Sequence, residues 1–368
     1  MTRVLFAVQH FRQGWGGAPE SVRLMARALS TQGVASDVYD RGSIVRDVGS
    51  LSLLPVHDCG RNDFDFSTAT GYRSIIQTGP WQSPLGLLRL RRARQNAHWI
   101  YLPRGGLAQV EFSRPRDVKK LPYLALIERR FIAASDAVVF SSETEQRHTL
   151  HWSFSPSQAV VIPDFVAPPR SRALADEGSR AVVTFAFLAE ISPRKGLQLL
   201  VDAFIAWVQS RGLETQVRLK VGGAPRPGSE SHLATIRARH AAVGSDGVQI
   251  EFLGAVPHGE RGAFYAATDV MVVASSFESF GLTVFEAMAE GCVVLSTPDV
   301  GALEQTEGMA GVITASAPTL DALHLGFDNA LHAHFRITRD ARAAEAQQGI
   351  ERSNALALAS WQKLLGIG

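Results

Sequence analysis

The feature that most constrains the fold is an alternation of short apolar runs with helical segments, which occurs twice along the chain. In each series, continuous runs rich in Val, Ile, Leu and Phe are followed by segments with apolar residues at helical spacing. Continuously apolar strands that alternate with helices are typical of parallel sheets covered by helices on both faces. We therefore expect two doubly wound α/β domains.

The first series occupies residues 1–165. It begins with a strand at Arg3–Gln9, a glycine-containing turn and a helix from Pro19 through Ser30, because proline is favoured in a first helical turn. Further strands are expected at Val34–Tyr39, Ser74–Gln77, His98–Leu102, Asp136–Phe140 and Ala159–Ile162. Residues 41–72 have no readable period and are expected to be loop or irregular structure.

The second series begins near residue 180. Its strands are expected at Ala181–Ala189, Gln216–Val221, Val248–Leu253, Asp269–Ser275, Cys292–Ser296 and Gly311–Thr314. Its helices are expected at Leu197–Val208 and near 231–242, 260–266 and 283–290. Residues 336–366 also have a helical period.

A segment rich in proline, charge and small residues, 163–180, separates the two series and is typical of a linker. The 368 residues are too many for one ordinary domain and suffice for two of roughly 150–200 each. We divide the chain into a first domain at residues 1–165, a linker at 166–180, a second domain at 181–345 and a C-terminal helix at 346–368. This helix is expected to pack on one of the two domains. Ligands of such sheets bind at the carboxyl ends of the strands, here expected to face a central cleft.

Composition narrows the class of protein. Apolar residues make up 46% and charged residues 20%, which favours a packed core over disorder. The two cysteines cannot form a disulfide framework or a zinc site, and no spacing of histidines indicates a metal. The apolar run at the N-terminus is about six residues, shorter than a signal peptide needs, and no segment reaches the roughly 20 residues of a membrane span. These observations predict a cytoplasmic protein.

Charge is unevenly distributed. Residues 1–165 hold 20 Lys+Arg against 14 Asp+Glu, a net charge of +6, whereas residues 166–368 carry −4. A basic N-terminal half favours an anionic partner, although ordinary scatter explains it equally well. The basic run Leu87–Gln95, with leucines between its arginines, predicts peripheral contact with an anionic membrane surface or, alternatively, a solvated helix face. Nucleic acid is not expected, because no basic stripe is interleaved with aromatic residues.

The segment Ser275–Gly291, SSFESFGLTVFEAMAEG, carries the strongest local signal. It places Glu278 in a loop after a buried strand and Glu286 in the helix that follows. A carboxylate accepts two hydrogen bonds side by side, which suits a vicinal diol such as a ribose. Backbone N–H groups at the start of that helix are suited to a phosphate or a sugar hydroxyl. The alternative is that Glu278 is a loop charge and Glu286 compensates the helix dipole.

This segment, with its two glutamates separated by seven residues in the context E-S-F-G-L-x-x-x-E-A-M-A-x-G, resembles the signature of glycosyltransferase family 4. The resemblance implies the GT-B fold, with an acceptor-binding N-terminal domain and a C-terminal domain that binds a UDP- or GDP-linked sugar. It implies that Glu286 holds the donor ribose and that Glu278 lies beside the transferred sugar. The amides of Phe280, Gly281 and Leu282 would contact the sugar or the diphosphate.

The segment Ala189–Phe204 resembles the family's G-R-L-x-P-E-K-G stretch, in which an arginine and a lysine hold the donor diphosphate. Lys195 matches, and a compact cation at a helix start suits a phosphate. Glu190 departs from the pattern, since it stands where the arginine is expected and would repel a diphosphate. Arg194 is a candidate to supply the missing charge.

Three other segments extend the resemblance. The turn Gly14–Val22 is similar to the family's G-G-A loop, which implies that Gly16 and Gly17 approach the donor phosphates. Leu102–Lys120 resembles a stretch of relatives that build bacterial surface polysaccharides, with Arg104 where many relatives have a histidine lining the sugar pocket. Arg104 then contacts a phosphate or the acceptor, or else forms a loop salt bridge. Val256 lies in a loop that resembles one approaching the base.

The resemblance implies a retaining, metal-independent transfer of a sugar to a hydroxyl of a glycan or lipid-linked acceptor, without cofactor, in polysaccharide or glycoconjugate biosynthesis. Lys195 and Glu278 would act at the reacting centre together with Arg104. One alternative is a non-catalytic subunit with the same fold, which Glu190 favours. A nucleotide-sugar epimerase or a phosphorylase would share the architecture, but the glutamate spacing argues against both. A carbohydrate-binding module fits the phosphate-binding loops poorly.

Overall fold

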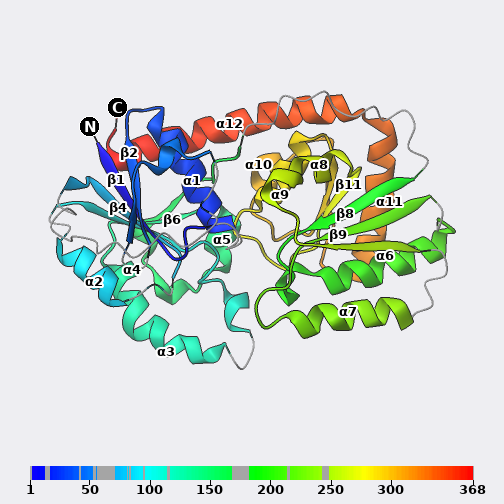
Figure 1. The fold of residues 1–368 in the computed structure, drawn as a ribbon, viewed down its shortest axis with the longest axis horizontal. Coiled ribbons are helices and arrows are strands. Elements are labelled where there is room, and N and C mark those ends of the chain that lie inside the picture. The colour runs from blue at the N-terminus through cyan, green and yellow to red at the C-terminus, as the bar shows by residue number, and fades with distance from the viewer. Residues whose placement is uncertain are drawn as a thin grey trace. The chain divides into compact units, whose positions relative to one another are not determined.

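The computed structural model describes residues 2–12, 17–40, 43–52, 55, 71–80, 82, 84–93, 96–113, 117–167, 182–213, 216–242 and 248–367. The chain divides into two compact units, which are described separately (Figure 1). Unit 1 comprises Met1–Val166 and Ser353–Gly368, and unit 2 comprises Ala167–Arg352.

Unit 1 is built on a seven-stranded sheet in the order β3-β2-β1-β4-β5-β6-β7, parallel except that β3 runs antiparallel to β2. Its strands are β1 (Arg3–Val8), β2 (Ala35–Asp40), β3 (Ser43–Val45), β4 (Ser74–Thr78), β5 (His98–Leu102), β6 (Ala137–Phe140) and β7 (Ala159–Val161). Its helices are α1 (Gly17–Ser30), α2 (Pro84–Ala93), α3 (Leu121–Tyr123), α4 (Arg129–Ala133) and α5 (Glu143–His148), with a π-helical turn, Leu124–Glu128, joining α3 to α4.

Strand β1 shows why the sequence of unit 1 reads as continuously apolar. Successive side chains of a strand point to opposite faces of the sheet. Val4, Phe6 and Val8 pack in a core with α1, whereas Leu5 and Ala7 pack in a second core with α2. Both faces of the strand are therefore buried, as a doubly wound sheet requires.

Unit 2 contains a parallel six-stranded sheet in the order β10-β9-β8-β11-β12-β13. Its strands are β8 (Val183–Leu188), β9 (Val217–Gly222), β10 (Gln249–Gly254), β11 (Val270–Val273), β12 (Val293–Ser296) and β13 (Val312–Thr314). Its helices are α6 (Leu197–Arg211), α7 (Glu230–Ala242), α8 (Arg261–Ala266), α9 (Leu282–Ala289), α10 (Leu303–Thr306), α11 (Leu320–Arg336) and the first part of α12 (Arg339–Leu365). Helices α6 and α7 lie on one face of the sheet, and α8 and α9 on the other (Figure 1).

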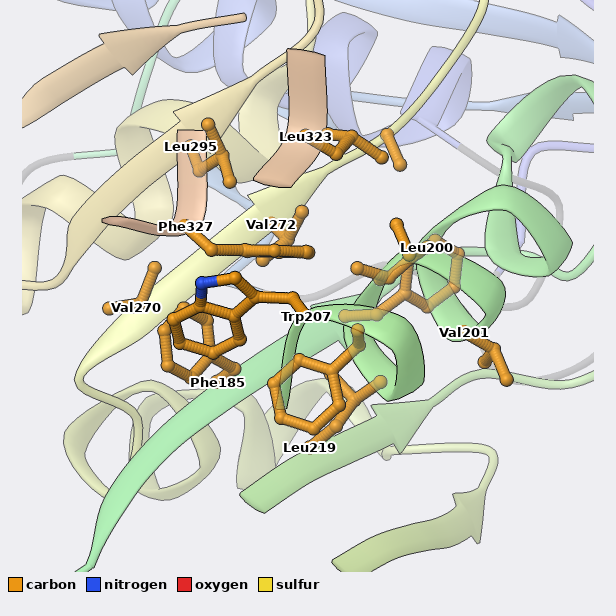
Figure 2. Packing of buried hydrophobic residues seen from close by; sticks show 14 of the residues in the cluster. Phe185, Leu200, Val201, Trp207, Leu219, Val270, Val272, Leu295, Leu323 and Phe327 are labelled. Carbon is orange, nitrogen blue, oxygen red and sulfur yellow. The ribbon is translucent and has the colours of Figure 1, made fainter. Parts of the chain in front are cut away.

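An aromatic cluster forms the centre of unit 2 (Figure 2). Phe185 of β8 contacts Phe204 and Trp207 of α6 and Phe327 of α11, with ring centroids 5.4 to 5.7 Å apart. These pairs have tilted or edge-to-face geometry, which aromatic rings prefer over face-to-face stacking. The cluster fixes α6 against β8, and therefore fixes the turn between them, which carries Lys195.

Helix α12 contributes residues to both units. Near its start, the buried Arg339 donates hydrogen bonds to the carbonyl oxygens of Tyr265, Thr268 and Glu290. Near its end, Trp361 and Leu365 are buried in the core of unit 1 with the strands and α1. The boundary between the units falls within this helix, seven residues after the boundary expected at 345/346.

The expected fold class of two doubly wound α/β domains is confirmed. The sequence did not indicate α11 or the short antiparallel strand β3. The proposed linker, residues 166–180, lies almost wholly outside the described residues. Among the helices of the described part, none combines the length and the apolar character needed to span a bilayer.

Candidate functional site

Glu278 lies in the loop that follows β11, and this loop is bound to the loop that follows β12. The Glu278 N–H donates to the Asp299 carbonyl oxygen at 2.9 Å, and the Gly301 N–H donates to the Glu278 carbonyl oxygen at 3.1 Å. Gly281 has a φ of 100°, and a Cβ atom there would lie 2.8 Å from Cγ1 of Val300. Glycine is therefore required for this approach, which fixes the backbone on both sides of Glu278.

Two cations reach the Glu278 carboxylate from the turn between β8 and α6. Lys195 Nζ pairs with Oε1. Arg194 Nη1 lies 3.5 Å from Oε2 and donates a hydrogen bond of 2.7 Å to the carbonyl oxygen of Phe277. Ser275 adds a hydrogen bond of 2.6 Å to Oε1. Arg194 thus reaches the same carboxylate as Lys195, and its proposed role in place of the cation that Glu190 fails to supply stays a prediction.

Close backbone packing makes this convergence possible. The Ser276 N–H donates to the carbonyl oxygen of Arg194 at 2.8 Å. Gly196 has a φ of 70°, and a Cβ atom there would overlap the carbonyl oxygen of Ala274. Both residues of the Lys-Gly pair therefore have a structural role. The glycine lets the turn contact the end of β11, and the lysine then faces the carboxylate.

The electrostatics of this cluster favour the charged form of Glu278, whereas the pKa of Lys195 is lowered overall. Burial raises the pKa of Glu278, but the charges of Lys195 and Arg194 and the hydrogen bonds from Lys195 and Ser275 outweigh it and lower the pKa to about 2. Burial lowers the pKa of Lys195, while the Glu278 charge acts in the opposite direction. Two cations face the Glu278 carboxylate. Glu190 also acts on Lys195 but has Arg226 beside it, so these five side chains carry one positive charge in excess. Such an arrangement is suited to an anion.

Glu286 lies in α9, eight positions after Glu278. Its Oε2 accepts a hydrogen bond of 2.6 Å from the Tyr265 hydroxyl, and its Oε1 lies 4.0 Å from Nη1 of Arg261. Its side chain is 23% exposed. Burial raises the pKa of Tyr265 well above its usual value, and the neighbouring carboxylate adds to the shift, so the phenol remains a donor. Glu286 is therefore fixed by Tyr265 while part of its carboxylate stays accessible.

The start of α9 separates these two glutamates. The Phe280 side chain is buried and stacks on Phe285 with ring centroids 5.6 Å apart, so only its backbone can contact a ligand. Gly281 precedes the helix, and Leu282 is its first residue. The first amides of a helix lack intrahelical acceptors and are suited to an anion, and the predicted contact of these N–H groups with the donor stays a prediction.

Glu190 and Val256 lie in other loops of unit 2. Glu190 Oε1 lies 3.9 Å from Nε of Arg226, which comes from the loop after β9. The repulsive carboxylate identified in the sequence thus has a cation beside it. Val256 is half-buried in the loop after β10, and its Cγ2 lies 2.9 Å from the position that a Cβ atom on Gly222 would take.

The remaining predicted residues belong to unit 1. Gly16 lies outside the described residues, and Gly17 is the exposed first residue of α1. Arg104 follows β5, and its Nη1 pairs with Oδ1 of Asp164, which also accepts a hydrogen bond of 2.9 Å from Ser21. Arg104 is thus placed in a different unit from Lys195 and Glu278, and its predicted role beside them stays a prediction.

The sequence missed several residues that shape the site. Ser275 is the first residue of the segment Ser275–Gly291, and its position three residues before Glu278 was an available signal. Tyr265 comes from α8 and Arg226 from the loop after β9, and neither residue was assigned a role from the sequence. Within the described ranges, no group of three or more His, Cys, Asp or Glu side chains is placed to hold a metal ion.

Comparison with known proteins gives one match within unit 2 and others that extend over more of the chain. Residues 182–324, most of unit 2, match the family model described as glycosyl transferases group 1. A D-inositol 3-phosphate glycosyltransferase of Kribbella flavida is 27% identical over 81% of this chain and 78% of its own length. The same enzyme of Corynebacterium glutamicum is 29% identical over 51% of this chain. The match covers 47%, or about half, of that relative's length.

Solved structures show the same fold over the whole chain. Sucrose-phosphate synthase from Thermosynechococcus elongatus has a TM-score of 0.73 at 19% identity, covering 100% of this chain and 98% of its own. Anabaena HepE in complex with UDP-glucose has a TM-score of 0.71 at 16% identity, with the same coverage. At these identities the likeness concerns the fold.

Residues 182–324 of this chain are thus similar to the group 1 glycosyltransferases, and the whole chain has a GT-B fold built from two Rossmann-like α/β units.

Proposed function

We propose that this protein transfers a sugar from a nucleoside diphosphate to an acceptor hydroxyl and retains the anomeric configuration. The observation that carries the proposal is the convergence of Lys195, Arg194 and Ser275 on the Glu278 carboxylate, beside the start of α9. A net positive cluster next to the first N–H groups of a helix is suited to a diphosphate, and a fixed carboxylate is suited to sugar hydroxyls.

In the proposed mechanism, the donor ribose is held by Glu286 and its diphosphate by Lys195, Arg194 and the first amides of α9. Glu278 accepts hydrogen bonds from the transferred sugar. The acceptor oxygen forms a bond to the anomeric carbon on the face from which the diphosphate leaves. The acceptor proton passes to a diphosphate oxygen, so atoms and charge balance. Positioning and neutralisation of the leaving group supply the catalysis, without a metal ion or cofactor.

The acceptor is proposed to bind unit 1, at the carboxyl ends of its parallel strands. Relatives of this chain are named for inositol phosphate and sugar phosphate products or substrates, among them a mannosylfructose-phosphate synthase of Agrobacterium fabrum. A glycan or lipid-linked acceptor in cytoplasmic polysaccharide or glycoconjugate synthesis is the wider class. Helix α2 supports contact with a membrane, because Leu85 and Leu88 are exposed beside its arginines.

Titration calorimetry with UDP, GDP and their common sugar conjugates, first without metal and then with magnesium, tests the proposal. We expect one nucleotide to bind with micromolar affinity in the absence of metal. Glu286→Ala should weaken this binding by about a hundredfold, and Lys195→Ala should also weaken it. If the folded protein binds none of these nucleotides, the transfer reaction is ruled out as proposed.

A non-catalytic subunit with the same fold is the second candidate, and Glu190 is the residue that favours it. The pairing of Glu190 with Arg226 weakens that argument, because the carboxylate charge is partly compensated. The same calorimetric titration separates the two candidates, since a non-catalytic subunit is expected to bind nucleotide weakly or not at all.

A further inference from the structure

We infer that Arg104 binds an oxyanionic group of the acceptor, a phosphate or a carboxylate. The inference rests on the proposed function, because it takes unit 1 as the part that binds the acceptor. Every contact that carries it lies within unit 1.

The guanidinium group of Arg104 has one occupied nitrogen and one open edge. Nη1 is bound to Asp164. Nε and Nη2, which together form one edge, have no hydrogen-bond partner in the described part of the chain. Arg23 shows what this edge does when a partner is present: its Nε and Nη2 bind the two carboxylate oxygens of Glu20, at 2.9 and 2.5 Å. The open edge of Arg104 has the same ability to hold two oxygens of one anion.

This open edge is not solvated. The Arg104 side chain is only 9% exposed, and Nε and Nη2 are shielded from solvent. Buried donors without a partner are uncommon, because each forfeits the hydrogen bonds that water would accept. A ligand oxyanion supplies the missing acceptors and also meets the positive charge.

The backbone at Arg104 is held in an unusual conformation. Its φ is 53°, in the left-handed region that residues with a side chain seldom adopt. The following residue, Gly105, donates its N–H to the buried Glu145 carboxylate, which also accepts hydrogen bonds from the N–H and hydroxyl of Ser141. Such strain persists where surrounding contacts enforce it, and it is concentrated at ligand sites.

The position in the sheet agrees with a ligand site. Arg104 follows β5, Glu145 follows β6 and Asp164 follows β7, and these neighbouring strands are parallel. Their carboxyl ends therefore meet at one edge, the edge at which α/β sheets bind ligands. Ser21 of α1 joins them through its hydrogen bond to Asp164. Four segments that are far apart in the sequence thus meet at one cluster.

The chemistry of the ligand follows from the shape of the open edge. Two parallel N–H bonds match two oxygens of a phosphate or carboxylate, whereas a single hydroxyl satisfies only one of them. Asp164 fixes the rotation of the guanidinium through Nη1, so the edge is oriented before the anion arrives. Arg104 is therefore a residue that determines acceptor specificity by selecting a charged acceptor over a neutral one.

The test uses three hexoses that differ only at carbon 6, namely glucose 6-phosphate, glucuronate and glucose, together with inorganic phosphate. Each is titrated into the full chain by calorimetry with the nucleotide site saturated by UDP, so that the donor cations are occupied. We expect at least one hexose anion to bind about tenfold or more tightly than glucose. Preference for glucose 6-phosphate identifies a phosphate site, and preference for glucuronate identifies a carboxylate site.

Variants locate the effect. Arg104→Lys keeps the charge but removes the two-nitrogen edge. It should lower the affinity for inorganic phosphate and for the hexose anions by about tenfold and leave the affinity for glucose unchanged. Arg23→Lys is the matched control, because its edge is already filled by Glu20. Melting temperatures confirm folding of both variants.

Equal binding of anions and glucose by the wild type, a comparison that needs no variant, would overturn the inference. Equal binding of phosphate by wild type and Arg104→Lys would do the same. If UDP itself does not bind, the titrations are run without it. A failed donor site and a failed Arg104 site are then distinguished.

Discussion

The Lys195 ammonium group and the Glu278 carboxylate form a largely buried ion pair, with side chains 16% and 14% exposed, and Arg194 lies 3.5 Å from the second carboxylate oxygen. In the proposed reaction, the two cations are required by the diphosphate, while the carboxylate is required by the sugar. In the free protein, Glu278 pairs with the cations that the donor diphosphate would bind. The carboxylate and the diphosphate therefore compete for the same two side chains. Binding of the donor is expected to exchange one anionic partner for another without leaving a buried charge unpaired.

Replacing Glu278 separates these two roles. Glu278→Gln should leave the affinity for UDP unchanged or slightly higher, because the cations no longer have a competing carboxylate. Turnover of the UDP-linked or GDP-linked sugar should fall by about 10² to 10³, the usual cost of losing one positioned polar contact in a transition state. Calorimetry with the nucleoside diphosphate and a product assay measure the two effects. A parallel loss of UDP binding would contradict this division.

The same pair predicts a dependence of stability on pH. The pKa of Glu278 is about 2 in the folded protein, against 4.5 as its ordinary value. A lowered carboxyl pKa stabilises the folded state above the unfolded pKa, and this stability is lost as the pH falls from about 4.5 to about 2. The loss is at most about 3 kcal/mol in the free energy of unfolding. Urea titrations across this pH range should show a smaller decrease in the free energy of unfolding for Glu278→Gln than for the wild type.

The hydrogen bond from Tyr265 to Glu286 predicts that substitutions of these two residues lower the affinity for UDP to different extents. Glu286→Ala should lower the affinity for UDP by about a hundredfold. Tyr265→Phe should lower it by about fivefold, since the carboxylate remains but is less well fixed. Calorimetry with 2′-deoxy-UDP provides the check. If Glu286 holds the ribose diol, the loss of binding free energy from removing the 2′-hydroxyl and the loss from removing the carboxylate should not add up in the double test. Additive losses would place Glu286 elsewhere.

The sequence predicted the fold well because its signals are local. Apolar strands such as Val270–Val273 are buried on both faces and can be read from composition alone. Helix α11 was missed although Leu323, Phe327 and Ala330 recur at helical spacing, because Gly326 interrupts the pattern. The structure explains that glycine: a Cβ atom there would lie 2.6 Å from Cδ1 of Leu295.

The candidate site was predictable in part. The resemblance located Glu278, Lys195 and Glu286, and the structure brings the first two into contact. Their partners could not be read, because Tyr265 and Arg226 reach the site through the packing of separate βα units. The open edge of Arg104 is likewise a property of three-dimensional contacts. A sequence motif shows that an arginine is present, but not which of its nitrogens is occupied.

Helix α2 predicts binding to anionic vesicles. Leu85 and Leu88 are 69% and 42% exposed, on a helix that ends in arginines. Replacing both leucines with glutamine should reduce binding to vesicles containing phosphatidylglycerol by tenfold or more, since burying a leucine contributes about 1.5–3 kcal/mol. Leu356→Gln, a change at a 52% exposed leucine of α12, is the control. Sedimentation with vesicles measures it, and binding unaffected by the double change would exclude α2 as the contact.

The pairing of Glu190 with Arg226 predicts which substitution improves the donor site. The two groups are 3.9 Å apart and partly exposed, so solvent screens them and the pair itself adds little stability. Glu190→Gln should raise the affinity for UDP by a few-fold through loss of repulsion, and Glu190→Arg by more, because it adds a cation. Arg226→Ala should lower the affinity, since Glu190 is then uncompensated. Calorimetry at low and high salt checks that the changes are electrostatic. If all three variants bind UDP as the wild type does, Glu190 lies away from the diphosphate, and its departure from the family pattern has no effect on the donor.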